Sequence, residues 1–153
     1  MERTYHTQME AAKQGVITPE LRIVAQKEGR TPEELLPLVA SGKVVIPANP
    51  KHTSLSPAGV GSMLRTKINV NLGVSRDCKD YEIEMQKVLS AVELGAEAIM
   101  DLSSHGDTQP FRQKLCRECP AMIGTVPIYD SVIHYQRDLA TLTAQDLLDV
   151  IRL

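Results

Sequence analysis

The chain has 153 residues, enough for one domain with a sizeable core but too few for an eight-unit barrel, which needs about 250 residues. Its formal net charge is −2 at pH 7 and its basic residues are dispersed, so binding to nucleic acid or to an anionic membrane has no electrostatic support. No apolar run approaches about 18 residues and no signal-peptide core is present, so we expect a cytoplasmic protein.

Three short helices are predicted near the start of the chain. One begins after Thr7, and two more begin where Thr18 and Thr31 each place a capping hydroxyl before a first-turn proline. Thr31 is also followed by Glu34, which completes a capping box. Pro37 lies past the first turn of the third helix, where it removes one backbone hydrogen bond.

A strand is predicted over residues 43–46, where three consecutive β-branched residues are stopped by prolines. The prolines and glycines of residues 47–62 favour a loop or linker. Residues 1–62 are therefore expected to form an N-terminal helical cap, followed by a region of repeating units over residues 63–153.

This second region repeats a short apolar strand at a fixed interval. The strands are predicted at residues 67–71, 98–103 and 123–129. Asn71, Met100 and Tyr129 follow one another at intervals of 29 residues. An interval of about 30 residues is typical of βα units, because parallel strands need a long crossover. We predict an α/β fold whose strand ends share one face; chance spacing in an ordinary doubly wound sheet is the alternative.

Helices are predicted between and after these strands. One over residues 81–92 is ended by Gly95, a second starts near Thr108, and a third begins at Thr143 and is still apolar-periodic at Leu153. The apolar face of the first, expected to pack on the sheet, consists of Tyr81, Met85, Val88, Leu89 and Val92. We therefore expect the N-terminal portion of a longer protein, interrupted in or just after its third crossover.

Cysteine and histidine spacing gives only weak metal signals. Cys116 and Cys119 have the spacing of two ligands, and Cys78 is a distant third thiol. A soft metal or an iron–sulfur cluster needs three or four converging thiolates, so no metal site is predicted in this segment. His52, in the loop before the first barrel strand, is assigned a surface role.

Six segments, in order along nearly the whole chain, resemble a known family. They are Thr7-Gln-Met, Ile17-Thr-Pro-Glu20, Ile46-Pro-Ala-Asn49, Lys67-Ile-Asn-x-Asn-x-Gly73, Met100-Asp-Leu-Ser103 and Ile123-Gly-Thr-Val-Pro-Ile-Tyr129. Together they resemble the phosphomethylpyrimidine synthase (ThiC) family of thiamine biosynthesis and its close relative, 5-hydroxybenzimidazole synthase of anaerobic cobamide biosynthesis.

The resemblance implies a carbon–carbon lyase of the radical S-adenosylmethionine type that converts 5-aminoimidazole ribonucleotide to hydroxymethylpyrimidine phosphate. This chain would form the helical cap and the first three βα units of a (β/α)8 barrel. The family's 4Fe-4S cluster and divalent metal are held by a C-x2-C-x4-C motif and by histidines of later strands, and neither occurs in this sequence. We expect this segment alone to bind no S-adenosylmethionine, cluster or metal, to contain no catalytic residue and to be inactive.

The resemblance also implies that the protein forms a homodimer and binds a small-molecule ribonucleotide as its substrate. Binding to nucleic acid or to a membrane is not expected. The family's substrate-binding residues match Asn71, Met100 and Tyr129, the positions that the repeat marks. The Asn71 amide suits an aminoimidazole ring or a ribose hydroxyl, the Tyr129 hydroxyl suits a phosphate or sugar oxygen, and the Met100 thioether suits contact with a flat heterocycle.

Asn69 shares the strand face of Asn71, and with Asp101 and Ser103 it is a candidate to support the binding residues. Each binding residue also has a purely structural interpretation. Asn71 is then a turn former, Met100 a core side chain and Tyr129 a half-buried aromatic. Two functions stay open at this point: the enzyme segment, with either product, or a non-catalytic assembly module that pairs exposed strand edges in an oligomer.

Overall fold

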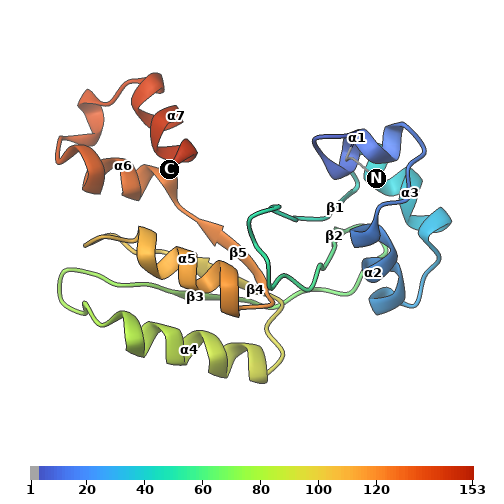
Figure 1. The fold of residues 1–153 in the computed structure, drawn as a ribbon, viewed down its shortest axis with the longest axis horizontal. Coiled ribbons are helices and arrows are strands. Elements are labelled where there is room, and N and C mark those ends of the chain that lie inside the picture. Colours follow the sequence, from blue (N-terminus) through green and yellow to red (C-terminus); the bar gives the residue numbers. More distant parts are fainter. Residues whose placement is uncertain (1–3) are drawn as a thin grey trace.

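A computed structural model describes residues 4–153, so the first three residues of the predicted cap lie outside the described part. The fold is a mixed α/β structure with a three-stranded parallel sheet and a separate two-stranded pair (Figure 1), which confirms the predicted class. In chain order the elements are α1 (Gln8–Lys13), α2 (Pro19–Glu28), α3 (Pro32–Ala40), β1 (Val44–Val45), β2 (Val60–Gly61), β3 (Asn69–Leu72), α4 (Tyr81–Glu93), β4 (Ala98–Asp101), α5 (Gln109–Glu118), β5 (Met122–Thr125), α6 (Pro127–Tyr135), a 3-10 turn (Leu139–Thr141) and α7 (Ala144–Arg152).

The predicted N-terminal helices are confirmed by their caps. Thr7, Thr18 and Thr31 each accept a hydrogen bond from a first-turn backbone N–H, and Thr31 and Glu34 form the capping box. Apolar side chains of α1, α2, α3 and β1 make a small core of their own. α3 continues through Pro37, and the Ser41 hydroxyl donates to the Pro37 carbonyl at 2.7 Å just beyond the helix end.

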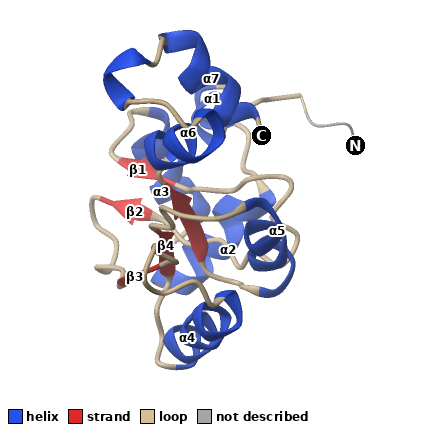
Figure 2. Ribbon diagram, turned by 90° about the vertical axis from the view of Figure 1, so that its left-hand side faces the viewer, coloured by secondary structure: helices blue, strands red, loops and turns tan. Residues whose placement is uncertain are grey.

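Residues 47–62 are not all loop, which corrects the sequence prediction. Val60 and Gly61 form β2 and pair antiparallel with Val45 and Val44 of β1 (Figure 2). Gly61 has φ +143°, and a Cβ there would lie 2.1 Å from the Lys43 carbonyl oxygen. Only a glycine allows the two backbones to approach so closely, and nothing local in the sequence reveals this distant pairing.

The predicted parallel βα units are confirmed. β3, β4 and β5 pair side by side in chain order, with α4 and α5 as the crossovers between them (Figure 1). The register places Asn71 beside Met100, and Met100 beside Gly124. Two backbone hydrogen bonds continue the ladder between β3 and β4 past the strand ends. The Leu102 N–H donates to the Leu72 carbonyl at 2.7 Å, and the Ser104 N–H donates to the Val74 carbonyl at 3.0 Å.

The third strand is shorter than predicted. β5 ends at Thr125, and Tyr129 lies in the first turn of α6 instead of at a strand end. Pro127 explains the difference, because it cannot donate to a strand ladder while its fixed φ suits the first turn of a helix. The register partner of Met100 is Gly124, only 24 residues later (124 − 100), so the 29-residue interval does not describe the second strand pair.

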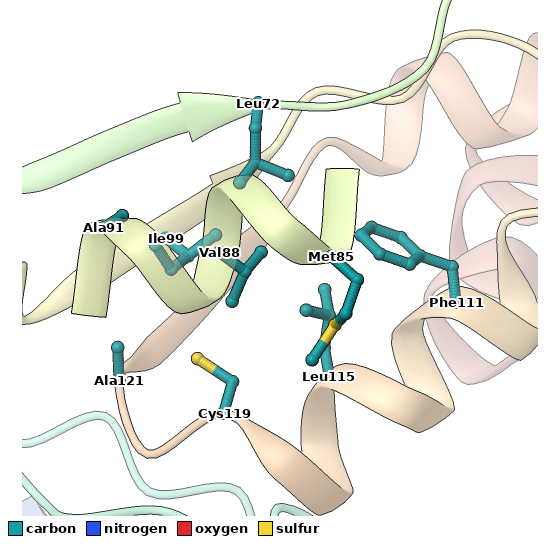
Figure 3. Close-up of a cluster of buried hydrophobic side chains, with 9 residues drawn as sticks. All are labelled: Leu72, Met85, Val88, Ala91, Ile99, Phe111, Leu115, Cys119 and Ala121. Atoms are coloured by element: carbon teal, nitrogen blue, oxygen red, sulfur yellow. The ribbon is translucent and has the colours of Figure 1, made fainter. Parts of the chain in front are cut away.

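The main core lies between the sheet and its two crossover helices. Met85 and Val88 of α4 approach Phe111 and Leu115 of α5, with Ile99 of β4 beside them (Figure 3). The predicted apolar face of α4 is wrong in one position: the Leu89 residue is 52% exposed. Ala91 and the Glu84 carboxyl are buried instead, because the crossing of α4 over the sheet turns that side inward.

Buried polar contacts join the N-terminal region to the sheet. Lys67, just before β3, pairs with Glu28 at the end of α2 at 2.6 Å, and the two side chains are only 4% and 2% exposed. The Glu28 carboxylate also accepts from the Arg65 backbone N–H at 2.8 Å. These contacts fix α2 against the start of the parallel sheet.

His52 is buried, not at the surface as predicted. Its Nε2 atom lies 2.7 Å from the Cys119 carbonyl oxygen, and the Ser54 hydroxyl donates to the same oxygen at 2.6 Å. The carbonyls at the end of a helix lack partners within the helix, so the loop that contains His52 supplies them at the end of α5. No helix within residues 4–153 combines the length and apolar character needed to cross a membrane.

Candidate functional site

The parallel sheet has one covered and one open face. Val70 and Leu72 of β3 and Ile99 of β4 contact the core under α4 and α5. Because side chains alternate along a strand, Asn71 of β3 and Met100 of β4 point to the opposite face. The structure thus brings two of the three predicted binding residues side by side on the open face.

Asn69 and Asn71 form a polar pair on this face. The Asn69 side-chain amide donates to the Asn71 Oδ1 atom at 2.8 Å, and both residues are exposed. This bond fixes the orientation of the Asn71 amide and directs its own NH₂ group away from Asn69. Asn69 therefore lies on the same strand face as Asn71 and contacts it directly, and its supporting role stays a prediction.

Met100 lies across a glycine of the neighbouring strand. A Cβ built on Gly124 would be 2.8 Å from the Met100 Cε atom and 2.9 Å from its sulfur. Any larger residue at Gly124 would displace the thioether, so this glycine determines how Met100 lies on the open face. The sequence contains Gly124 within the motif that carries the resemblance, but without the register its partner could not be identified.

Tyr129 is separate from this pair. It lies in the first turn of α6, beyond the end of β5, and the residue is 43% exposed. Its position along the chain is five residues past Gly124, the register partner of Met100. Tyr129 therefore belongs to the rim after the third strand and not to the row of strand side chains.

The turn after Asn71 requires a glycine. Gly73 has φ +136°, and a Cβ there would lie 2.5 Å from the Ser103 backbone nitrogen. The Gly73 N–H donates at 2.8 Å to the carboxylate of Glu84, which is fully buried. Glu84 thus holds the chain in this conformation directly after the strand, a role that the sequence analysis did not find.

Asp101 and Ser103 form a buried hydrogen-bonded unit at the end of β4. The Asp101 Oδ1 atom accepts from the Ser103 N–H at 3.0 Å and from its hydroxyl at 2.5 Å. The Ser103 hydroxyl oxygen also accepts from the Val74 N–H at 3.1 Å, which links the end of β4 to that of β3. Both predicted supporting residues are buried and do not face the open side.

Arg112 of α5 completes the unit. Its Nε atom donates to Asp101 Oδ2 at 2.8 Å, and its Nη1 atom donates to Asp130 of α6 at 2.6 Å. Burial by itself lowers the pKa of the Arg112 guanidinium, but its hydrogen bonds to Asp130 and Asp101 outweigh burial, so the pKa is raised. The sequence analysis missed Arg112 and Asp130. The available signal was that Asp101 falls on the core-facing side of its strand, where a carboxylate requires a partner.

The cysteines do not fit an iron–sulfur cluster. Cys119 is fully buried in the main core, Cys116 is partly buried, and burial raises the pKa of both thiols. Cys78 is exposed in the loop before α4. Within residues 4–153, no group of three or more His, Cys, Asp or Glu side chains is placed to hold a metal ion.

A cavity of about 640 Å³ lies beside Arg112 and Asp130 and is bounded by α5, α6, α7 and residues 49–53. Asn71, Met100 and Tyr129 are not among its described lining residues. The predicted binding residues therefore lie on an open sheet face and a helix rim, not in this cavity.

Three parallel strands joined by crossover helices, with amide and thioether side chains on the open face of the sheet, define a protein of the α/β class. Residues 7–153 match the model of the Radical SAM ThiC family, and the chain belongs to this family. The family resemblance predicted from the sequence is confirmed.

The chain is similar to several phosphomethylpyrimidine synthases. The one from Clostridioides difficile (strain 630) is 56% identical over 148 residues, which cover 97% of this chain and 34% of the relative. Those from Clostridium novyi (strain NT) and Alkaliphilus metalliredigens (strain QYMF) are 56% and 55% identical over 147 residues, covering 96% of this chain and 34% of each relative. The chain spans about a third of the length of the curated relatives it matches.

Proposed function

We propose that this chain is the N-terminal, substrate-binding segment of a phosphomethylpyrimidine synthase. The reaction is then the one that the family resemblance implies, conversion of 5-aminoimidazole ribonucleotide to hydroxymethylpyrimidine phosphate in thiamine biosynthesis. The observation that carries this proposal is 56% identity across 97% of the chain to a protein of that name. The same name among the similar relatives favours the pyrimidine product over the benzimidazole one.

In this proposal β3, β4 and β5 with their helices are the first three units of a (β/α)8 barrel. The open face of the sheet becomes the barrel interior, and Asn71 and Met100 contact the ribonucleotide there. The Asn71 NH₂ group, oriented by Asn69, donates to a ring nitrogen or a sugar oxygen. Met100 contacts the flat heterocycle, and Tyr129 on the rim binds a phosphate or sugar oxygen.

The chain belongs to a radical S-adenosylmethionine family, so a full-length member uses S-adenosylmethionine and a 4Fe-4S cluster. Because the cysteines described above do not suit a cluster, we assign the cluster and a divalent metal to other parts of the enzyme. This segment then binds and orients the ribonucleotide and is inactive alone. The carbon–carbon lyase reaction, the homodimer and the cytoplasmic location are part of the same proposal.

The proposal is tested by titrating the chain, labelled with 13C at the methionine methyl groups, with 5-aminoimidazole ribonucleotide. We expect the Met100 methyl resonance to shift, because aromatic rings displace the resonances of methyl groups that lie on them. Met63, which is 63% exposed in the loop before β3, is the matched control and keeps its resonance. Ribose 5-phosphate, which lacks the heterocycle, leaves both unchanged. An unmoved Met100 signal at millimolar ribonucleotide contradicts the proposed contact.

A further inference from the structure

We propose that Arg112 is a positioning residue that holds α6, and with it Tyr129, against the end of β4. This inference rests on the proposed function, because Tyr129 matters for turnover only if it binds the ribonucleotide. Arg112 itself lies on α5 and reaches the two neighbouring elements with two different nitrogen atoms. Three observations carry the inference.

The first is that Arg112 contacts, at one end, a carboxylate that is buried and hydrogen-bonded on both oxygens. The Asp101 carboxylate is completely buried, and both of its oxygens accept hydrogen bonds, from Ser103 and from Arg112. A buried carboxylate that lost these donors would leave an uncompensated charge in the protein interior. The Arg112 Nε atom is therefore fixed relative to the end of β4.

The second is that α6, which packs on α7, has no fully buried apolar side chain of its own. Of its nine residues, all of which the structure describes, Ser131 alone is fully buried. Ile128 and Val132 are both 40% exposed, close to the 43% of Tyr129. The polar contacts of Asp130, from Arg112 at 2.6 Å and from the Thr108 hydroxyl at 3.3 Å, therefore attach the start of α6 to the βα units.

The third is that the contacts form one connected path. It runs from the Val74 N–H through Ser103 and Asp101 to Arg112, and from there to Asp130. Each end lies within three residues of a predicted binding residue, Asn71 or Tyr129, and Met100 precedes Asp101 directly. An arginine is needed at its centre because its planar fork donates in two fixed directions, whereas a lysine carries a compact charge on one flexible stem.

The test compares Arg112→Lys with Arg117→Lys, which changes an exposed arginine on the same helix. The chain contains four tyrosines, so 3-fluorotyrosine labelling gives four 19F resonances, and Tyr129→Phe identifies the one of interest. We expect Arg112→Lys to shift or broaden the Tyr129 resonance and to leave that of Tyr5 unchanged. Arg117→Lys should reproduce the parent spectrum.

Asp130→Asn is the second variant, because it removes the charge at the α6 end and leaves the buried Asp101–Arg112 pair intact. It should disturb the Tyr129 resonance as Arg112→Lys does, and the double variant should add little. An unchanged Tyr129 resonance in either folded variant overturns the inference. Loss of all four resonances as sharp signals in both variants also overturns it, because the network would then stabilise the whole fold instead of positioning α6.

Turnover separates this inference from the proposed function. In the full-length synthase that contains these residues, Arg112→Lys should lower kcat/KM for the ribonucleotide by about 10-fold or more, since a misplacement of about 1 Å can cost 100-fold. Arg117→Lys should leave it unchanged. A disturbed Tyr129 resonance with normal kcat/KM would preserve the positioning role of Arg112 and remove Tyr129 from the proposed binding site.

Discussion

At the scale of single residues, the proposed site depends on side chains whose orientation is set by an immediate neighbour. The Asn69 amide fixes Asn71, and the absence of a side chain at Gly124 leaves room for Met100. Such arrangements place polar and polarizable groups on the open face at little conformational cost, because strands hold them rigidly. They also make the consequences of substitution specific.

In the full-length enzyme, Asn71→Ala should weaken ribonucleotide binding or turnover more than it weakens folding. Loss of one neutral hydrogen bond costs about 0.5–1.5 kcal/mol, which corresponds to roughly a 2- to 13-fold effect. Thermal stability and single-turnover rate should be measured on the same preparation. Asn69→Ala is the comparison, because it removes the Asn69–Asn71 hydrogen bond but keeps the Asn71 amide. A lowered melting temperature beside normal turnover would show that Asn71 only shapes the turn before Gly73.

Gly73→Ala should destabilise the chain by more than about 2 kcal/mol. Its positive φ costs about 1–3 kcal/mol for a residue with a side chain, and the new Cβ also meets the Ser103 nitrogen. Gly15→Ala is the matched control, because Gly15 also has positive φ but no atom within 4 Å of such a Cβ. Urea unfolding measures both. Equal losses for the two variants would mean that the close approach to β4 contributes nothing.

At the scale of elements, the buried pair between Glu28 of α2 and Lys67 before β3 determines how the helical region meets the sheet. Burial by itself raises the pKa of the Glu28 carboxyl, but hydrogen bonds from Lys67 and from the Arg65 backbone outweigh burial and lower it. A carboxyl whose pKa is lowered by folding stabilises the protein above its unfolded pKa of about 4.3. That stability is lost as pH falls through the folded value.

Glu28→Gln should therefore remove part of the loss of stability on acidification below about pH 4.3. At pH 7 the variant should be less stable by about 3–5 kcal/mol, because it leaves the Lys67 ammonium buried without its charge partner. Denaturant midpoints at pH 7 and in the acid range measure both effects. Glu33→Gln, at an exposed position of α3, is the control. Parallel pH profiles for the parent and Glu28→Gln would contradict the assignment.

At the scale of the whole molecule, cluster chemistry requires converging thiolates, which the described chain does not provide. Anaerobic reconstitution with iron and sulfide should therefore leave this chain without a stoichiometric cluster. The full-length enzyme, treated in parallel, is the positive control. Iron analysis and absorbance measure the outcome. Stoichiometric iron with cluster absorbance that disappears in Cys116→Ser would show that Cys116 and Cys119 do form a ligand pair.

The sequence alone determined the features that depend on neighbouring residues. The caps at Thr18, Thr31 and Thr143 are correct, because a capping hydroxyl acts on an N–H only three residues away. The strand–helix alternation is also correct, because apolar periodicity and the residues that begin and end a helix are local features. The 29-residue interval matches the register of Asn71 and Met100 but not that of the second strand pair.

The tertiary structure decided which of these residues are buried and what they contact. Tyr129 lies in a helix and not at the predicted strand end, and Leu89 is exposed instead of packed on the sheet. His52 is buried against the end of α5. The network from Val74 to Asp130 joins residues up to 56 positions apart (130 − 74), so no local pattern contains it. Burial and charge pairing arise only when distant segments meet, and for this reason the residues that hold the site together could not be read from the sequence.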